Sequence, residues 1–338
     1  MEGKVARERT QKRKRMAQYL VTGGAGFIGS HIVEALIEKG EQVRVFDNFS
    51  TGKKENLSEV SRPVEMIEGD IRNFTLCAHA MEGVEYVIHL AALHEVSRSV
   101  ERPLETHEVN VTGILNLLLT ARDGGIKRFV YASSSAVYGN SPVLPRSEGM
   151  MLSPISSPYA VSKLAGEYYC QLFSYLYGFE TVSLRYFNVY GPRQDSTSHY
   201  AGVIPKFISA LLSDRAPTIY GDGEQSRDFV YVADCVTATL TACHKPDLSG
   251  AVLNIGTGQR TTVNHLCTLL QGILRRKTPP RFDTPQPGDI RHDYADIEKA
   301  RQTLSYQPSW DIEEGLRETV TWYQKSESRV LREKGDEK

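Results

Sequence analysis

The stretch that decides the fold is VTGGAGFIGSH, residues 21–31. It follows a short apolar run and precedes an amphipathic segment, residues 28–38, which Gly40 ends. This order predicts a strand, a tight turn and a helix. Three glycines stand in the turn at G-x-x-G-x-x-G spacing: Gly23, Gly26 and Gly29.

Each of these glycines has its own physical use. Gly23 permits the tight turn, Gly26 lets the backbone approach a pyrophosphate, and Gly29 lets the helix lie close to the sheet. The free N–H groups and the dipole at the helix start favour an anion. We therefore expect residues 21–31 to bind a dinucleotide.

An acid follows at the expected distance. The second apolar segment, QVRVF, leads into Asp47, 18 residues after Gly29. A carboxylate there accepts hydrogen bonds from an adenosine ribose and would repel a 2′-phosphate. Asp47 therefore favours NAD over NADP, a preference that Lys53 and Lys54 nearby would soften.

A second motif, Y-x-x-x-K, lies in SPYAVSKLAGEYY. Tyr159 and Lys163 are four residues apart, so a helix would place both side chains on one face. A free tyrosine, with a pKa of about 10, is a poor base at neutral pH, but a neighbouring ammonium favours the phenolate. The pair predicts a general base; alone it would also fit an exposed helix.

A cluster of serines ends another apolar strand, in FVYASSSAVYG at residues 129–139. Strand ends are where an α/β sheet exposes side chains to its ligand. Ser134 stands 25 residues before Tyr159, and a hydroxyl beside that phenol would share a proton with it and hold the reacting oxygen. Serine clusters otherwise mark turns.

The composition narrows the class of protein. Of the 338 residues, 40% are apolar and 24% are charged, as in soluble globular proteins, and the formal net charge is −1. This balance predicts no nucleic-acid or membrane partner, and no segment approaches the roughly 20 apolar residues of a spanning helix. The cysteines are odd in number and scattered, so we expect reduced thiols, a cytoplasmic location and no metal site: Cys77, Cys170, Cys235, Cys243 and Cys267.

The first 16 residues differ from the rest. Residues 1–15 carry seven Lys/Arg against two Glu and almost nothing apolar, so we expect residues 1–16 to form a disordered basic extension. The segment lacks the apolar core of a secretory signal.

Strand-like and helix-like runs alternate from residue 17 to about residue 190. The expected strands are 18–22, 42–46, 64–67, 85–90, 127–132 and 180–186, and the expected helices are 27–39, 73–81, 106–123 and 158–177. This rhythm predicts the α/β class, with a Rossmann-type doubly wound parallel sheet. Residues 188–202, rich in Gly, Pro and Ser, interrupt it. Beyond them we expect short strands at 218–220 and 252–255 and helices at 203–213, 233–243, 262–273 and 311–324.

Further motifs complete a recognisable order. GDI (69–71), HLAA (89–92), RYFNVYGPRQD (185–195) and GDGEQSRDFVYVADC (221–235) stand in sequence with the features above. Over roughly residues 17–325 the chain resembles the extended short-chain dehydrogenase/reductases of the nucleotide-sugar epimerase type. The resemblance implies an NAD-binding Rossmann domain at 17–190, to which segments around 228–255 return. It also implies a smaller mixed α/β cap at 191–330 that mainly binds the nucleotide sugar.

The resemblance also implies a cofactor site for NAD. Its residues are Gly23, Gly26, Phe27, Ile28, Gly29, Asp47, Asn48, Ser50, Thr51, Gly52, Asp70, Ile71, Leu90, Ala91, Ala92, His94, Tyr159 and Lys163.

The implied reaction is inversion of C4 in UDP-glucose, UDP-galactose or their N-acetyl forms through a transient 4-keto sugar. Tyr159 would act as the base, Lys163 would hold the phenol charged, and Ser134 would bond the reacting oxygen. The implied substrate-binding residues are Ser134, Ser135, Asn188, Val203, Tyr220, Arg227 and Asp289.

Three positions depart from the family pattern. Gln286 precedes the PGD triplet where a second phosphate-binding arginine is usual, so Arg291 or Arg281 would have to compensate, or the diphosphate is held less tightly. Asp293 stands where residue size separates N-acetylated from plain hexoses, and Glu95 stands where a small or neutral residue is usual. Two acids beside the sugar would repel a uronate; they would hydrogen-bond hydroxyls or attract an amino sugar.

Other functions share this scaffold. A 4,6-dehydratase of this type would carry an Asp-Glu pair directly after the active-site hydroxyl, where this chain has Ser135 and Ala136. A reductase that releases NADH would also fit the trio of Tyr159, Lys163 and Ser134. A non-catalytic NAD-binding regulatory protein would not need Tyr159, Lys163 and Ser134 together.

The resemblance implies a homodimer as well. The expected helices 106–123 and 158–177 carry broad apolar faces, and in related enzymes the equivalent pair forms a four-helix bundle between two subunits. Amphipathicity alone would fit packing within one chain equally well.

Overall fold

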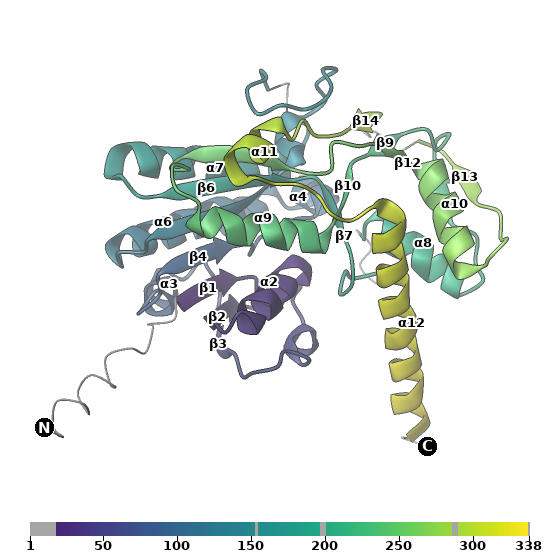
Figure 1. The fold of residues 1–338 in the computed structure, drawn as a ribbon, viewed down its shortest axis with the longest axis horizontal. Coiled ribbons are helices and arrows are strands. Elements are labelled where there is room, and N and C mark those ends of the chain that lie inside the picture. Colours follow the sequence, from purple (N-terminus) through teal and green to yellow (C-terminus); the bar gives the residue numbers. More distant parts are fainter. Residues whose placement is uncertain (1–17, 153–154, 197–200, 286–289, 337–338) are drawn as a thin grey trace, which may run out of the picture.

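The structure is a computed structural model that describes residues 18–152, 155–196, 201–285 and 290–336. The expected basic extension, together with Gln286 and Asp289, therefore lies outside the described residues. Two lobes are visible in Figure 1, a larger one built on a sheet and a smaller one that ends in a long helix.

Seven parallel strands form the central sheet, in the order β11-β6-β5-β4-β1-β2-β3. The predicted doubly wound α/β fold is confirmed by this order, because the chain winds outward in both directions from β1 and β4. The strands are β1 (Gln18–Thr22), β2 (Gln42–Asp47), β3 (Glu65–Glu68), β4 (Tyr86–His89), β5 (Arg128–Ser134), β6 (Thr181–Tyr186) and β11 (Ala251–Ile255).

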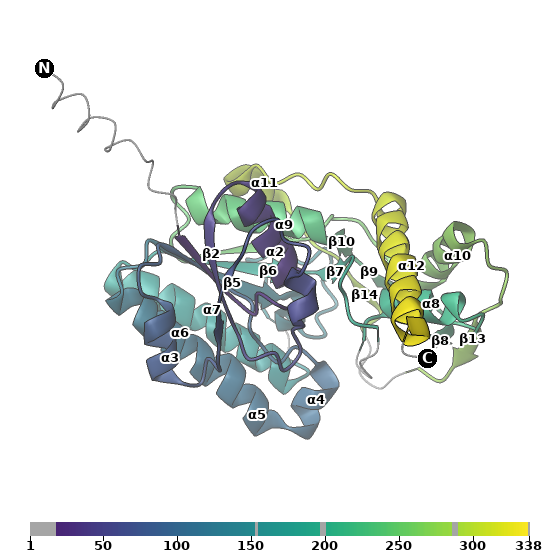
Figure 2. The same ribbon diagram turned by 90° about the horizontal axis from the view of Figure 1, so that it is seen from below.

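Helices cover both faces of this sheet (Figures 1 and 2). One face carries α2 (Phe27–Glu38) and α9 (Val232–His244); the other carries α3 (Phe74–Ala80), α6 (Gly113–Asp123) and α7 (Pro158–Tyr177). Side chains alternate between two buried cores: Tyr19 and Val21 pack on the α2 side, and Leu20 on the α6 side. Burial on both faces explains why these strands read as nearly continuous apolar runs.

The smaller lobe lies beyond the carboxyl ends of the strands (Figure 1). It contains α8 (Val203–Leu212), α10 (Val263–Leu274) and α12 (Ile312–Asp336), with short strands β8 (Thr218–Tyr220) and β13 (Arg281–Asp283) and a three-stranded sheet of β9 (Ser226–Arg227), β12 (Thr261–Thr262) and β14 (His292–Asp293). A parallel pair, β7 (Asn188–Tyr190) and β10 (Phe229–Tyr231), stands between the lobes. Between α8 and α10 the chain returns to the larger lobe, where α9 packs on α2 and β11 pairs with β6.

The expected helix 106–123 is in fact three consecutive elements. They are α5 (Pro103–His107), a π-helical turn (Glu108–Thr112) and α6, and α4 (Val96–Glu101) precedes them. The π-helical turn shifts the apolar stripe along the helix surface but does not interrupt it. The sequence pattern therefore resembles that of one continuous helix. The expected helix 311–324 continues to Asp336.

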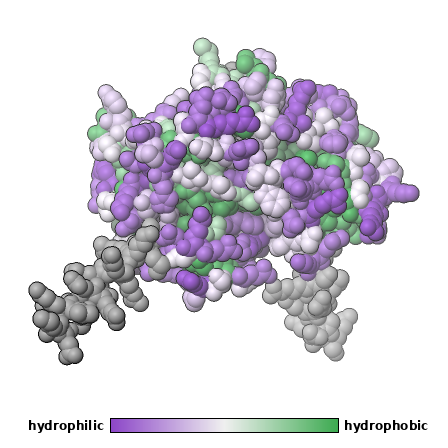
Figure 3. Space-filling view, in the orientation of Figure 1, coloured by the Kyte–Doolittle hydropathy of each residue, from purple (hydrophilic) through white to green (hydrophobic). Residues whose placement is uncertain are grey.

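Polar residues cover most of the face seen in Figure 3, and apolar ones form only small separate areas on it. Within the described ranges, no helix combines the length and apolar character needed to cross a bilayer. In the same part of the chain, no three His, Cys, Asp or Glu side chains are grouped to hold a metal ion.

A buried carboxylate joins the two lobes. Asp228, between β9 and β10, is fully buried and accepts hydrogen bonds from the backbone N–H groups of Thr257 (2.8 Å), Gly258 (2.9 Å) and Ala295 (3.1 Å). The Thr257 hydroxyl donates a fourth bond at 2.6 Å. The carboxylate therefore ties the end of β11 to the segment after β14.

Replacing Asp228 with alanine should lower the free energy of unfolding by about 3 kcal/mol, because three backbone N–H groups lose their carboxylate acceptor. Urea denaturation would measure the loss. Asp228→Asn keeps one acceptor oxygen and should cost less. Equal stability of the alanine variant and the parent protein would show that water replaces the carboxylate.

Candidate active site

The glycine turn leaves room only for glycine at its key positions. Gly23 has a φ of +70°, and a Cβ there would lie 2.7 Å from the backbone nitrogen of Ala91. A Cβ on Gly29 would overlap the carbonyl oxygen of Gly23. No side chain caps the start of α2, whose N-cap residue is Gly26. The turn is thus a backbone cradle at a helix N-terminus, which suits a pyrophosphate.

Asp47 stands at the end of β2, beside this cradle. Its carboxylate is buried and accepts hydrogen bonds from the backbone N–H groups of Ala25 (3.0 Å) and Phe49 (2.9 Å). Burial raises the pKa of Asp47, and these N–H groups act in the opposite direction. Space is tight at Gly52, where a Cβ would lie 3.0 Å from the Asp47 carboxylate. A carboxylate oxygen has further lone pairs with which to accept a ribose hydroxyl.

The neighbouring strand end carries a second fixed acid. Asp70, after β3, accepts hydrogen bonds from Arg72 Nε and Nη2 (2.9 Å each) and from Asn48 (3.0 Å). The Arg72 side chain is the main reason that the pKa of Asp70 falls to about 2. Asn48 also accepts from the backbone N–H of Ser50 (3.0 Å), so the loops after β2 and β3 hold each other in place.

The segment after β4 is held by an asparagine that the sequence analysis missed. Asn110, in the π-helical turn, accepts from the backbone N–H of Leu93 (2.8 Å) and donates to its carbonyl (2.9 Å) and to Ser162 Oγ (3.0 Å). These bonds hold Leu93, in the segment after β4, against α7. The sequence offers little signal for this role, because Asn110 stands among other polar residues.

The three predicted catalytic side chains lie together at the carboxyl end of β5. Ser157 caps α7 by accepting the N–H of Ala160 (3.2 Å), and Tyr159 and Lys163 occupy its first turns. Ser134 ends β5 and hydrogen-bonds the Tyr159 side chain. Lys163 Nζ donates to the carbonyl of Ala132 at 2.7 Å and lies 6.0 Å from the centre of the Tyr159 ring.

Burial dominates the protonation of this group. It raises the pKa of Tyr159, while the hydrogen bond with Ser134 lowers it. Burial also lowers the pKa of Lys163 to about 8, against the opposing charge of Glu167. Desolvation of the phenol is the largest effect on the pKa of Tyr159, and the lowering of that pKa by the Lys163 ammonium stays a prediction.

The expected substrate residues come from the second half of the chain. The backbone brings Asn188 on β7 close to Arg227 on β9. The N–H of Asn188 donates to the carbonyl of Asp228, the residue that directly follows Arg227 (3.0 Å). Val203 begins α8, and Tyr220 ends β8 with 38% of its surface exposed. None of these four belongs to an element that carries the catalytic trio.

Both unexpected acids have cationic partners. Asp293 lies opposite Arg227 in the pairing of β14 with β9 and accepts a hydrogen bond from Arg146 Nε at 3.0 Å. Arg146, another residue that the sequence analysis missed, is fully buried. Glu95 lies 3.7 Å from Arg98. Each carboxylate therefore has a guanidinium beside it, which would weaken the repulsion of a uronate; that repulsion stays a prediction.

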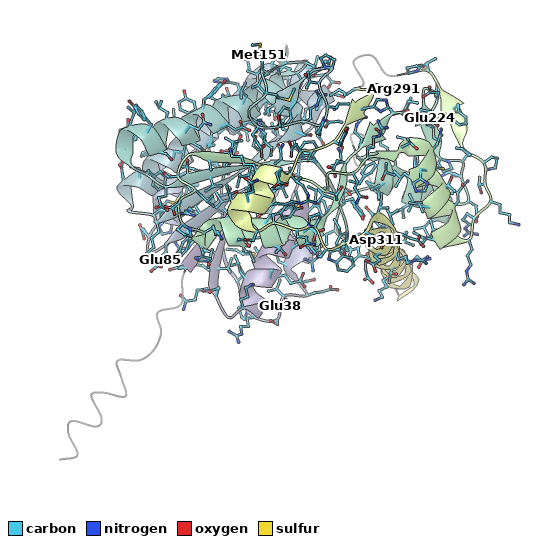
Figure 4. The ribbon with its side chains drawn as sticks, turned by 45° about the horizontal axis from the view of Figure 1, so that its top comes forward. Glu38, Glu85, Met151, Glu224, Arg291 and Asp311 are labelled. Carbon is cyan, nitrogen blue, oxygen red and sulfur yellow. The ribbon has the colours of Figure 1, made fainter. Side chains whose placement is uncertain are left out.

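The two arginines named as substitutes for a missing phosphate ligand are engaged elsewhere. Arg291 makes a bidentate pair with Asp222 (2.7 and 2.9 Å) and lies beside Glu224 at the surface (Figure 4). Arg281 lies 3.4 Å from Asp283. Neither arrangement favours a role in holding a diphosphate.

Comparison with known proteins agrees with this geometry. Residues 19–256 match the family model described as the NAD dependent epimerase/dehydratase family. The UDP-glucose 4-epimerase of Mycolicibacterium smegmatis is 40% identical over 308 residues, which cover 90% of this chain and 97% of that protein.

Two solved structures are similar over nearly their whole length. The UDP-N-acetylglucosamine 4-epimerase of Methanobrevibacter ruminantium, in complex with UDP-N-acetylmuramic acid, is 42% identical with a TM-score of 0.88, covering 92% of this chain and 99% of that one. The UDP-glucose 4-epimerase of Thermus thermophilus, in complex with NAD, is 36% identical with a TM-score of 0.82, covering 91% and 99%. With such matches along most of its length, the chain belongs to the NAD-dependent epimerase/dehydratase family.

Proposed function

We propose that the protein is an NAD-dependent isomerase that inverts C4 of a UDP-hexose or a UDP-N-acetylhexosamine. The observation that carries this proposal is the group of buried Tyr159 and Lys163 with half-buried Ser134 at the same end of the strands as the glycine cradle. The family match and the similar 4-epimerases support the same reaction.

The residues present fit NAD. Gly23 and Gly29 leave a cradle that any Cβ would fill, and the uncapped start of α2 offers its N–H groups to a pyrophosphate. Asp47 would accept the hydroxyls of the adenosine ribose. When bound, the nicotinamide supplies the hydride acceptor and donor that a C4 inversion requires.

The chain's own residues would handle the proton. Tyr159 takes the proton of the sugar 4-hydroxyl as that carbon is oxidised, and returns it when the 4-keto sugar is reduced on its other face. Ser134, already bonded to Tyr159, would hold the reacting oxygen. The Lys163 ammonium would stabilise the phenolate.

Inversion requires a firm hold on the nucleotide and a loose one on the sugar, since the 4-keto sugar must turn over. Arg227 would hold the diphosphate, because a guanidinium matches two phosphate oxygens. Asn188 would contact the sugar and diphosphate, and Val203 and Tyr220 would line the uracil. Ser135 would add a contact to the sugar; Asp289, outside the described residues, stays a prediction.

The rival reactions lack support at specific positions. Ser135 and Ala136 begin the 3₁₀ turn directly after β5, where a 4,6-dehydratase of this type would place two carboxylates. A non-catalytic regulator would not need Tyr159, Lys163 and Ser134 together. We therefore place epimerisation first.

The test is to mix the purified protein with UDP-glucose, UDP-galactose and their N-acetyl forms, and to follow the anomeric protons by NMR without added NAD. The 4-epimer should appear, because the cofactor is regenerated in every cycle and stays bound. Tyr159→Phe should lower turnover by about 10²–10⁴-fold and leave UDP binding unchanged. Full activity in this variant would remove Tyr159 as the base, and net NADH production would indicate a reductase.

Gly23→Ala should reduce the NAD that co-purifies with the protein, because the new methyl group would meet the backbone of Ala91. Gly125→Ala is the matched control: its φ is +69°, but nothing lies within 4 Å of the added Cβ. NAD released by denaturation, measured per mole of protein, compares the two variants. Equal NAD content would show that the cradle tolerates a side chain.

We propose that the protein also forms a homodimer, as expected from the sequence. Exposed apolar side chains share one face of α7, and others lie on α4 and α5, which pack against it: Val96, Val100, Leu104, Val161, Tyr168, Leu172 and Tyr175. Such a face favours a second copy of the chain.

The five cysteines are free and buried, which supports the proposed cytoplasmic location.

Introducing charge on this face should separate the subunits. Tyr168→Glu with Leu172→Glu should sediment as a monomer, because two carboxylates would be buried at the interface. Met151→Glu, at an apolar residue that is 92% exposed and precedes α7 in the chain (Figure 4), is the control. A dimer that survives both changes would exclude this face.

A further inference from the structure

A buried acid lies one helical turn beyond Lys163 and has no part in the proposed proton transfer. Glu167 is 1% exposed and makes a bidentate pair with Arg185, whose Nε and Nη2 donate at 2.9 and 2.7 Å. Ser133 Oγ donates to the same carboxylate. The three side chains come from α7, β6 and β5.

This cluster joins the catalytic helix to the sheet at one register position. Ser133 and Arg185 are direct partners in the parallel pairing of β5 with β6, and both reach Glu167. Ser133 immediately precedes Ser134. A Cβ on Gly166 would overlap the Tyr131 hydroxyl, so the helix can approach β5 this closely only with glycine there.

Stability alone is a weak reason for such a pair. Replacing a buried ion pair with apolar residues of similar volume is often neutral for folding, whereas removing one partner is costly. The position of Glu167 gives a better reason. Tyr159, Lys163 and Glu167 follow one another at intervals of four residues, so they lie along one face of α7.

Two contacts with β5 hold the Lys163 side chain. Its Nζ donates to the Ala132 carbonyl and lies 5.0 Å from the centre of the Tyr131 ring on β5. The titratable groups that face it from the elements around are Tyr131 on β5, His89 on β4, His94 after β4, and Tyr159 and Glu167 on its own helix. Glu167 is the carboxylate in this set.

We propose that Glu167, clamped by Arg185 and Ser133, is a positioning residue that fixes α7 on the strand ends and supplies the negative charge that keeps Lys163 an ammonium. The inference rests on the proposed function, since it assigns Glu167 a task in that proton transfer. Glu167 acts through Lys163 and does not touch the substrate.

Burial and the Glu167 carboxylate decide in which direction the pKa of Lys163 would shift if that carboxylate were removed. Burial lowers the pKa of Lys163 to about 8, and Glu167 opposes that fall. Without the carboxylate, Lys163 would lose its proton at a lower pH. Turnover that needs the ammonium would then decline earlier as the pH rises.

The test compares three variants by one ratio. It is kcat measured one pH unit above the Lys163 pKa of about 8, divided by kcat measured one pH unit below it. Glu167→Gln should lower this ratio by about threefold or more, and its melting temperature should fall because Arg185 is left buried and unpaired. Glu167→Gln with Arg185→Met should keep the lowered ratio but regain thermal stability. Glu167→Asp, which retains the charge on a shorter side chain, should keep the parent ratio with a reduced kcat.

A purely structural role predicts a different pattern. In that case kcat would fall equally at all pH values in Glu167→Gln, and the double variant would recover both stability and the parent ratio. An unchanged ratio in the two variants that lack the carboxylate would overturn the proposal.

A second measurement separates failure of this proposal from failure of the proposed function. The ionisation of Lys163 itself, followed by the chemical shift of its side-chain carbon next to Nζ in isotope-labelled protein, needs no substrate. If Glu167 holds the charge, Lys163 should lose its proton at lower pH in both variants without the carboxylate. An unmoved ionisation would overturn the proposal even if no sugar nucleotide is turned over.

Discussion

The parallel pairing of β4, β5 and β6 determines where the catalytic groups lie. Because these strands run in one direction, the segment after β4, the serines that end β5 and the segment after β6 all leave the sheet at one edge. Tyr131 and Ser133 share the face of β5 that packs against α7. Ser133 therefore reaches Glu167, and Ser134, which ends the strand, bonds Tyr159 on the same helix.

Local patterns in the sequence predicted the parts of the site that are local in the chain. The glycine spacing, the acid after β2 and the Y-x-x-x-K pair each depend on a few neighbouring residues. Arg146 escaped prediction because its partner, Asp293, is 147 positions away. Two-residue strands such as β9, β12 and β14 are too short to show a period. They form because the surrounding fold brings their backbones together.

Reading charges from sequence has a related weakness, since it supplies no partners. Asp293 and Glu95 looked like bare acids facing a sugar, yet each lies beside an arginine from another part of the chain or from the next turn. Asp228, Glu167 and Asp293 are all buried, and each has donors arranged around it. A buried carboxylate without such donors would cost several kcal/mol of folding free energy. Burial of an acid therefore already indicates that hydrogen-bond donors surround it.

The return of the chain to the sheet has a consequence for synthesis on the ribosome. β11 completes the sheet against β6, but it follows about 65 residues later, after α8 and α9. Until Ile255 has emerged, β6 is an edge strand whose outer N–H and C=O groups are open to another strand. Part of the smaller lobe, including α8, is also synthesised before β11. The nascent protein thus carries an unsealed sheet for the time needed to translate this insertion, and a chaperone that covers strand edges would act in that interval.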